Sequence, residues 1–195
     1  MKFLPLLSAT IAAFSIPKDA IATAIYTQKD DSSTVDVLYP RATSLFYVSS
    51  GDIKYNSSYG LIYKGTGSMS DSDITTLVTF EVPEAWVGKN CTLHFDLAPG
   101  DVLSGSNTAD VFTSLTVVEW SSSNWSPGNQ RDEHLGRFRV DGSRKGKWID
   151  THDEDTPQFK CPANEVVAWE LVGVSDRVKI RWAAHSGNGP RMEVV

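Results

Sequence analysis

The stretch CTLHFDL, residues 91–97, decides the fold class because apolar and polar residues alternate along it. Its cysteine, leucines and phenylalanine fall on one face of an extended strand, and His94 and Asp96 fall on the other, since successive side chains point to opposite sides. A strand of this kind packs its apolar face on a core and turns its polar face toward solvent, as in antiparallel sheets. The stretch therefore predicts an antiparallel sheet with a hydrophobic core on one side.

Similar short segments recur along the chain, and clusters of Gly, Pro, Asn and Asp separate them. Helical spacing is nowhere sustained over three turns, and only residues 83–87, which begin with a proline, favour a single helical turn. Short alternating strands with turn residues between them are typical of sandwiches and barrels. We therefore predict a single all-β domain, an antiparallel β-sandwich, over about residues 43–195. The expected strands are 44–48, 59–63, 74–82, 91–97, 111–120, 135–140, 166–171, 178–182 and 192–195.

Length and composition agree with one globular domain and exclude several classes of protein. The chain has 195 residues, 41% of them hydrophobic, which is enough to bury a sizeable core. Its formal net charge is −6, with 18 Lys and Arg against 24 Asp and Glu and no basic stripe, so we expect no nucleic-acid binding. Two cysteines cannot form a four-thiolate zinc site.

The N-terminal residues 1–24 have the layout of a secretory signal peptide. Lys2 supplies a positive start, residues 3–16 form a mostly apolar run, and small-residue cleavage signals follow within residues 20–24. The apolar run is shorter than the about 20 residues that a membrane-spanning helix needs, and no second stretch reaches that length. We therefore expect a secreted protein without a membrane span, located outside the cell or in the cell wall. The polar residues 25–42 are expected to form a flexible lead-in to the domain.

Secretion determines how the two cysteines, Cys91 and Cys161, are interpreted. In an oxidising compartment an isolated pair is most simply one disulfide, with two buried free thiols or a nucleophile as the alternatives. The crosslink would close a loop of about 70 residues, which is worth about 4 kcal/mol in the chain-entropy model. A disulfide-bonded domain is therefore the favoured interpretation.

Secretion also gives a meaning to three Asn-x-Ser/Thr sequons, which are acceptors for N-linked glycans. They begin at Asn56, Asn90 and Asn124. Small residues surround Asn56, whereas Asn90 adjoins a cysteine that the disulfide can engage first, and bulky Trp125 and a proline follow Asn124. We therefore expect a glycoprotein in which Asn56 is the favoured acceptor.

Two cysteine-centred segments resemble a known family. The first is WVGKNCTLHF, residues 86–95, and the second is FKCPANEVVAWEL, residues 159–171. A Gly-Lys-x-Cys-x-Leu strand followed by Phe-x-Cys-Pro-Ala and an alternating strand that ends in Glu-Leu is similar to the fungal But-two-type C-terminal domain. The resemblance covers about residues 43–195.

This resemblance implies a β-rich fold, a disulfide between Cys91 and Cys161, and a fungal secreted source. The family is named after a Uba-three-binding protein, and the resemblance supplies no catalytic residues. A secreted protein would be separated by a membrane from the cytosolic ubiquitin-like conjugation machinery to which that name refers. We therefore expect a different partner for this chain.

The residues that carry chemistry form no recognisable catalytic or metal-binding motif. His94 and Asp96 share one face of their strand and could ligate a metal, but a solvated outer face is the simpler interpretation. The acidic run Asp150 to Asp155 could supply oxygen ligands to a divalent ion, yet its spacing matches no EF-hand loop, and a solvated loop is favoured. Glycoside hydrolysis uses a pair of carboxylates that come together only in the folded protein, so the sequence alone does not identify such a pair. We predict no catalytic site, no metal site and no cofactor, and a protein without enzymatic activity is the favoured interpretation.

Binding has more support than catalysis because the chain contains six tryptophans. Trp120 and Trp125 flank a polar Ser-Ser-Ser-Asn segment, and Trp148 lies just before the acidic run. Tryptophans on loops stack on sugar faces or anchor protein partners, although packing against the sheet is the simpler interpretation of each.

The prediction is thus a secreted, non-catalytic β-sandwich that acts as an extracellular or cell-surface interaction module for a glycan or a protein. The alternative is a carbohydrate-active protein. It would be either a glycan-binding module or a hydrolase with an unrecognised pair of carboxylates.

Overall fold

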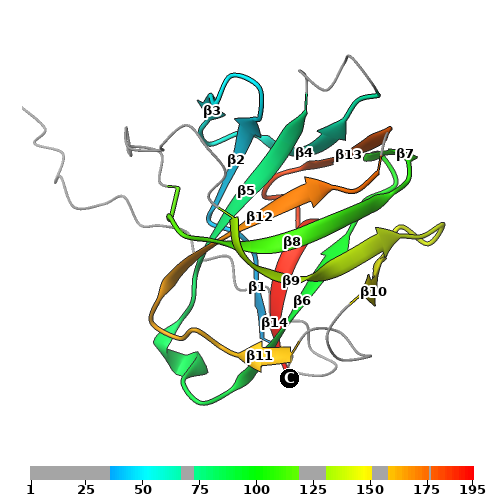
Figure 1. The fold of residues 1–195 in the computed structure, drawn as a ribbon. Helices are drawn as coiled ribbons and strands as arrows, with labels where there is room; N and C mark the ends of the chain where they lie inside the picture. The colour runs from blue at the N-terminus through cyan, green and yellow to red at the C-terminus, as the bar shows by residue number, and fades with distance from the viewer. Residues whose placement is uncertain (1–35, 67–72, 119–130, 151–157, 176) are drawn as a thin grey trace, which may run out of the picture.

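The computed structural model describes residues 36–66, 73–118, 131–150, 158–175 and 177–195, and their regular structure is almost entirely β-strand (Figure 1). Within these residues the 3-10 turn η2 (Glu84–Trp86) is the sole helical element, and it follows Pro83 as the sequence indicated. All paired strands of the described chain are antiparallel and form two sheets. The predicted all-β antiparallel sandwich is therefore confirmed. No helix in this part of the chain is long and apolar enough to cross a membrane.

The smaller sheet contains four strands of the described chain in the order β1, β14, β6, β11. Their bounds are β1 (Val37–Leu38), β14 (Gly189–Val194), β6 (Asn90–Asp96) and β11 (Gln158–Lys160). The alternating stretch that decided the fold class forms β6. Leu93 and Phe95 are buried in the core, whereas His94 and Asp96 are half-buried on the opposite face. The assignment of the two faces from the sequence is therefore correct.

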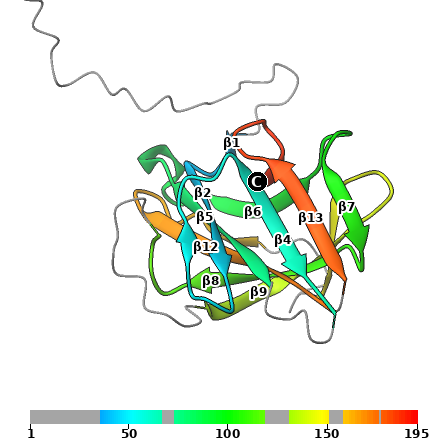
Figure 2. The same cartoon turned by 90° about the horizontal axis from the view of Figure 1, so that it is seen from above.

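The larger sheet contains ten strands of the described chain, and its main path runs β10, β9, β8, β12, β5, β4, β13, β7. Strands β2 and β3 lie off this path, because β2 pairs with β5 and with β3. The bounds are β2 (Ala42–Tyr47), β3 (Ile53–Lys54), β4 (Tyr59–Lys64), β5 (Ile74–Glu81), β7 (Val102–Gly105), β8 (Thr108–Ser114), β9 (Arg131–Val140), β10 (Gly146–Asp150), β12 (Val166–Gly173) and β13 (Val178–Ala183). Strands β4, β13 and β7 lie side by side at one end of this sheet (Figure 2).

The hydrophobic core lies between the two sheets. Phe95 of β6 contacts Phe138 of β9 and Trp182 of β13, with ring centroids 4.8 and 5.1 Å apart. Trp182 also packs against two glycines: an ideal Cβ on Gly60 would lie 2.0 Å from its ring, and one on Gly189 would lie 2.2 Å from it. The indole fills this space because neither neighbour has a side chain. The ring of Trp182 therefore connects β13 and β4 of the larger sheet with β6 and β14 of the smaller one.

The single crosslink joins Cys91 in β6 to Cys161, directly after β11, with an S–S distance of 2.06 Å and Cα atoms 5.0 Å apart. The amide of Cys161 donates a hydrogen bond to the carbonyl oxygen of Lys89 at 3.1 Å. The predicted disulfide is confirmed, and neither cysteine is a free thiol or a nucleophile. The crosslink fixes the short edge strand β11 against β6.

Several boundaries differ from those that the sequence indicated, and β1, β3, β7, β10 and β11 were not among the expected strands. Part of the expected lead-in, residues 25–42, belongs to the domain, because Val37 of β1 pairs with Glu193 of β14 and β2 already begins at Ala42. Strand β8 is Thr108–Ser114 and not 111–120, since the chain bends after it and leaves Leu115 67% exposed. The expected signal peptide, residues 1–24, lies outside the described residues.

Candidate binding site

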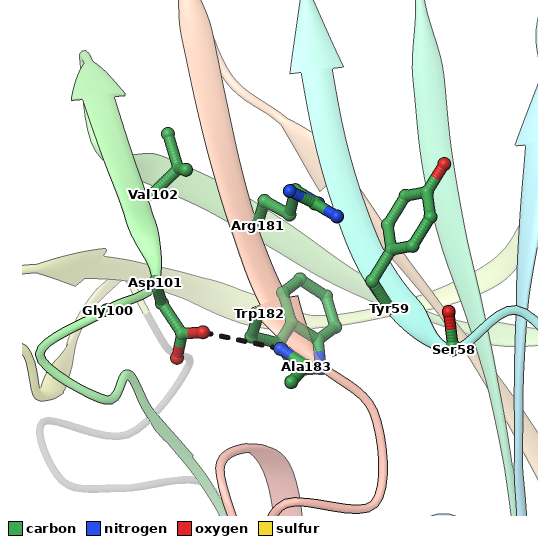
Figure 3. Close-up of a pocket in the computed structure, with 8 residues that line it drawn as sticks. All are labelled: Ser58, Tyr59, Gly100, Asp101, Val102, Arg181, Trp182 and Ala183. Atoms are coloured by element: carbon green, nitrogen blue, oxygen red, sulfur yellow. Dashed lines mark hydrogen bonds between the residues drawn. The ribbon is translucent and has the colours of Figure 1, made fainter.

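A pocket of about 230 Å³ lies where β4 begins, β13 ends and β7 begins (Figure 3). Its lining residues are Ser58, Tyr59, Gly100, Asp101, Val102, Arg181, Trp182 and Ala183. They come from three segments that are distant in the sequence but adjacent in the sheet. This pocket is smaller than the roughly 300–1,000 Å³ of a site for a drug-sized molecule. Its size suits one ring of a larger ligand.

Strand β13 places Arg181 in this pocket because its side chains alternate strictly between the core and solvent. Val178, Ile180 and Trp182 are buried, and the residues between them are exposed. Arg181 lies opposite Leu61 of β4 on one side and Val102 of β7 on the other. Its guanidinium therefore projects from the middle of a three-stranded surface.

The ring of Tyr59 has two cations against it. The guanidinium carbon of Arg181 lies 4.5 Å from the ring centroid, and the ammonium nitrogen of Lys54 lies 5.0 Å from it. Contacts of this kind are worth about 0.5–1 kcal/mol each at exposed sites. Within the described residues, neither Arg181 nor Lys54 forms an ion pair with a carboxylate. Two uncompensated positive charges thus meet at one aromatic ring.

Asp101 is fixed on the other side of the pocket by hydrogen bonds from the main chain. Its Oδ2 accepts a hydrogen bond from the amide of Ala98 at 2.7 Å, and its Oδ1 accepts one from the amide of Ala183 at 3.3 Å (Figure 3). Arg144 secures the same loop, since its Nη1 donates to the carbonyl oxygens of Ala98 and Asp101 at 3.0 and 3.1 Å. Each carboxylate oxygen has a lone pair left over. Asp101 can therefore accept a hydrogen bond from a ligand and keep its own contacts.

The composition of the lining favours recognition over proton transfer. It holds one carboxylate and one guanidinium, with no imidazole and no thiol among the eight residues. A cation, an anchored carboxylate, a hydroxyl and an aromatic ring instead suit a ligand that is polar, ring-shaped and charged.

The two strand residues considered as metal ligands, His94 and Asp96, share a face but contact other side chains. Arg191 donates from Nη1 to Asp96 Oδ2 and from Nε to Glu193 Oε1, both at 2.6 Å. His94 Nε2 lies 2.9 Å from Thr92 Oγ1 and 3.4 Å from Glu193 Oε2. Burial lowers the pKa of His94, the Glu193 carboxylate opposes that shift, and Arg191 adds to it. In the described part of the chain no group of three or more His, Cys, Asp and Glu side chains could hold a metal ion.

Trp148, which the sequence indicated as a candidate glycan or partner contact, lies in strand β10 and not in a loop. Its Nε1 donates a hydrogen bond to the carbonyl oxygen of Leu93 at 3.0 Å, and its ring lies edge-on to Phe138 with centroids 5.7 Å apart. The side chain is half-buried at the edge of the core. Packing against the sheet, the simpler of the two interpretations, therefore describes its contacts. Trp120 and Trp125 lie outside the described residues.

Two of the three sequons are exposed at their asparagine. Asn56 lies in the turn between β3 and β4, with a φ of 47°, and Asn90 is the first residue of β6. Asn56 is close in sequence to Ser58 and Tyr59, which line the pocket. Asn124 and residues 151–155 of the acidic run lie outside the described part of the chain.

The main pocket residues, Tyr59, Asp101 and Arg181, were not candidates from the sequence. The alternation of β13 indicates that Arg181 is exposed, because Lys179 and Arg181 alternate with apolar residues. Nothing local indicates that Tyr59 and Asp101 would be its neighbours. Strand pairing brings them together, and pairing is not encoded in the spacing of any one segment.

Residues 50–187 of the chain match the family model described as Ubiquitin 3 binding protein But2 C-terminal domain. The match covers more than half of the 195 residues and includes both cysteines and the three segments that line the pocket. It agrees with the resemblance carried by the two cysteine-centred segments. No curated protein sequence matches the chain.

Proposed function

We infer that this chain, which belongs to the But2 C-terminal domain family, works by binding another molecule and not by catalysing a reaction. The family is named after a binding protein, and the fold and disulfide of this chain agree with a rigid binding module. The observation that carries the inference is the pocket between Tyr59, Asp101 and Arg181. It combines an anchored carboxylate with cations that have no ion-pair partner among the described residues, and its lining holds no imidazole and no thiol.

The proposal includes a place of action outside the cell. Residues 1–24 have the layout of a signal peptide. The Cys91–Cys161 disulfide supports this location, because disulfides persist in oxidising compartments and are rare in the cytosol. An extracellular protein would not meet cytosolic ubiquitin-like machinery. Its partner would then be a glycan or a protein of the cell surface or cell wall.

The experiment measures retention and turnover together. The purified mature protein is incubated with isolated cell walls, insoluble chitin and insoluble β-glucan, and both the protein left in solution and the soluble sugar released are measured. We expect retention by the walls without any release of sugar. Retention should fall strongly in the Arg181→Gln variant.

The matched control is Arg139→Gln. Arg139 is an exposed arginine in β9 of the same sheet. Strand β9 lies near the opposite end of the strand order from β13 and β7, so this substitution also removes one positive charge but does so far from the pocket. We expect this variant to be retained like the wild type. Release of soluble sugar, absence of retention by walls, or equal effects of the two substitutions would contradict the proposed function.

A further inference from the structure

We propose that the ligand of this pocket is an acidic glycan, with the carboxylate of a uronic-acid residue bound by Arg181 and its hydroxyl groups bound by Asp101. This inference rests on the proposed binding function and specifies the class of ligand.

The cations near the pocket form no ion pair with a carboxylate among the described residues. The chain has more acidic than basic residues, 24 against 18, and four of its eight arginines form ion pairs in the described structure. Examples are Arg137 with Asp110 at 2.7 Å and Arg191 with Asp96 at 2.6 Å. On the surface of β3, β4 and β13, the described residues offer no carboxylate partner to Lys54, Lys179 or Arg181. A cluster of uncompensated cations on an acidic protein is electrostatically complementary to an anionic ligand.

The same surface carries the aromatic rings of two tyrosines beside its positively charged side chains. Tyr59 and Tyr63 project from β4, half-buried, on the same side of the sheet as Lys179 and Arg181 of β13. Tyr63 lies opposite Lys179. Residues two apart on a strand are separated by about 6.8 Å, so cations and rings recur along the surface. A polymer of charged sugar rings matches this pattern, because aromatic side chains pack on apolar ring faces while cations meet the carboxylates.

The anchored carboxylate of Asp101 favours a sugar over an acidic peptide. Its oxygens can accept hydrogen bonds from ligand hydroxyl groups, and Ser58 adds a hydroxyl at the same rim. Extended peptides that bind sheets pair with a free strand edge. Here β13 is paired on both sides, with β4 and β7, and β4 is paired with β13 and β5. The strands that carry Tyr59 and Arg181 therefore offer side chains on a sheet face, and the strand with an unpaired side at this pocket is β7, the last in the sheet order.

The test compares three probes in calorimetric titrations: oligogalacturonate, the same oligomer with its carboxylates methyl-esterified, and poly-glutamate. Esterification removes the charge and keeps the sugar ring, so it isolates the role of the carboxylate. We expect binding of oligogalacturonate at least about tenfold tighter than of either other probe. Arg181→Gln should weaken that binding at least about tenfold, whereas Arg139→Gln should leave it unchanged. Circular dichroism at rising temperature verifies that both variants are folded.

Equal binding of the esterified oligomer, or binding of poly-glutamate as tight as that of oligogalacturonate, would overturn the inference. Equal effects of the two arginine substitutions would overturn it as well. If walls retain the protein through Arg181 but oligogalacturonate does not bind, the ligand class is wrong and the binding function stands. Loss of retention by walls would instead contradict the binding function itself.

Discussion

The indole ring of Trp182 lies directly on the bare Cα of Gly60, so that a Cβ at position 60 would lie 2.0 Å from ring atom Cζ2. The two residues face each other in the register of β13 and β4. Trp182 is 1% exposed, and it also lines the pocket between Tyr59 and Asp101. Packing of the core and the shape of the binding site therefore depend on the same contact.

Replacing Gly60 with alanine should destabilise the domain by about 1–3 kcal/mol, the usual cost of overpacking a close-packed core. The added Cβ meets a buried ring and not the mobile end of a flexible side chain. Urea unfolding followed by tryptophan fluorescence measures the free energy of unfolding. Gly142→Ala is the control, because a Cβ there meets nothing within 4 Å. Equal stability of the two variants would contradict the packing described for Trp182.

Glu170 is a second buried residue whose role is testable. It is 1% exposed, and its Oε1 accepts hydrogen bonds from Thr75 Oγ1 at 2.7 Å and Arg131 Nη2 at 3.1 Å. Glu170→Ala should cost about 2–5 kcal/mol, since it creates a cavity and removes the hydrogen-bond acceptor of the buried Thr75 hydroxyl. Glu81→Ala, which breaks a surface ion pair with Arg41, should cost less than about 1 kcal/mol. Chemical denaturation of both variants distinguishes these outcomes, and a small effect at Glu170 would refute this role.

Stability should fall as the pH falls below the ordinary pKa of 6.5 of histidine, in part because of His94. Burial lowers its pKa in the folded protein, while the Glu193 carboxylate opposes that shift, Arg191 adds to it, and Asp96 opposes it. The unfolded chain therefore binds a proton at a higher pH than the folded chain does. The contribution of neutral His94 to the stability of the fold is fully present above the pKa that this histidine has in the unfolded chain. It is lost as the pH falls through 6.5 toward the pKa of His94 in the folded protein.

The His94→Gln variant tests this assignment, because glutamine is polar and does not titrate. Melting temperatures of the wild type and the variant are compared over about pH 7.5 to 5.5. The wild type should lose more stability over this range than the variant. Parallel curves would show that His94 has the same pKa in both states.

The expected secretion and glycosylation can be measured on one sample of protein from the culture medium. N-terminal sequencing should find a chain that begins at Thr23 or Ile25, directly after one of the two cleavage signals. Enzymatic removal of N-linked glycans should lower the mass, and Asn56→Gln should abolish that change, because Asn56 is exposed in a turn. Asn90→Gln serves as the matched control, and this variant should still lose mass when the N-linked glycans are removed. A protein that keeps residues 1–24 and is found inside the cells, and not in the medium, would contradict the proposed location.

Residues with a strong local pattern could be predicted from the sequence, and residues that depend on pairing could not. The alternation of residues 91–97 identified β6, its buried face and the cysteine that forms the disulfide. Strands β1 and β11 span two and three residues, too short for any periodicity to appear. Trp148 looked like a loop residue because the acidic run follows it, yet its indole is hydrogen-bonded to Leu93 on the other sheet.

The pocket illustrates the second case most clearly. Arg181, Tyr59 and Asp101 each lie in an ordinary strand or turn, and none of them belongs to a motif. Their proximity depends on the register of β13 with β4 and β7, which long-range packing selects. The alternation of a single sequence can therefore indicate that Arg181 is exposed, but not which residues surround it.

The most direct test of the central claim maps which backbone amides respond to a ligand. Two-dimensional NMR spectra of the labelled protein are recorded during titration with soluble oligogalacturonate. The pocket on β4, β13 and β7 predicts shift changes concentrated at residues 58–61, 100–103 and 181–184, with residues 137–139 of β9 unchanged. Shift changes concentrated on β9, with none around Tyr59 and Arg181, would contradict the assignment of the binding site.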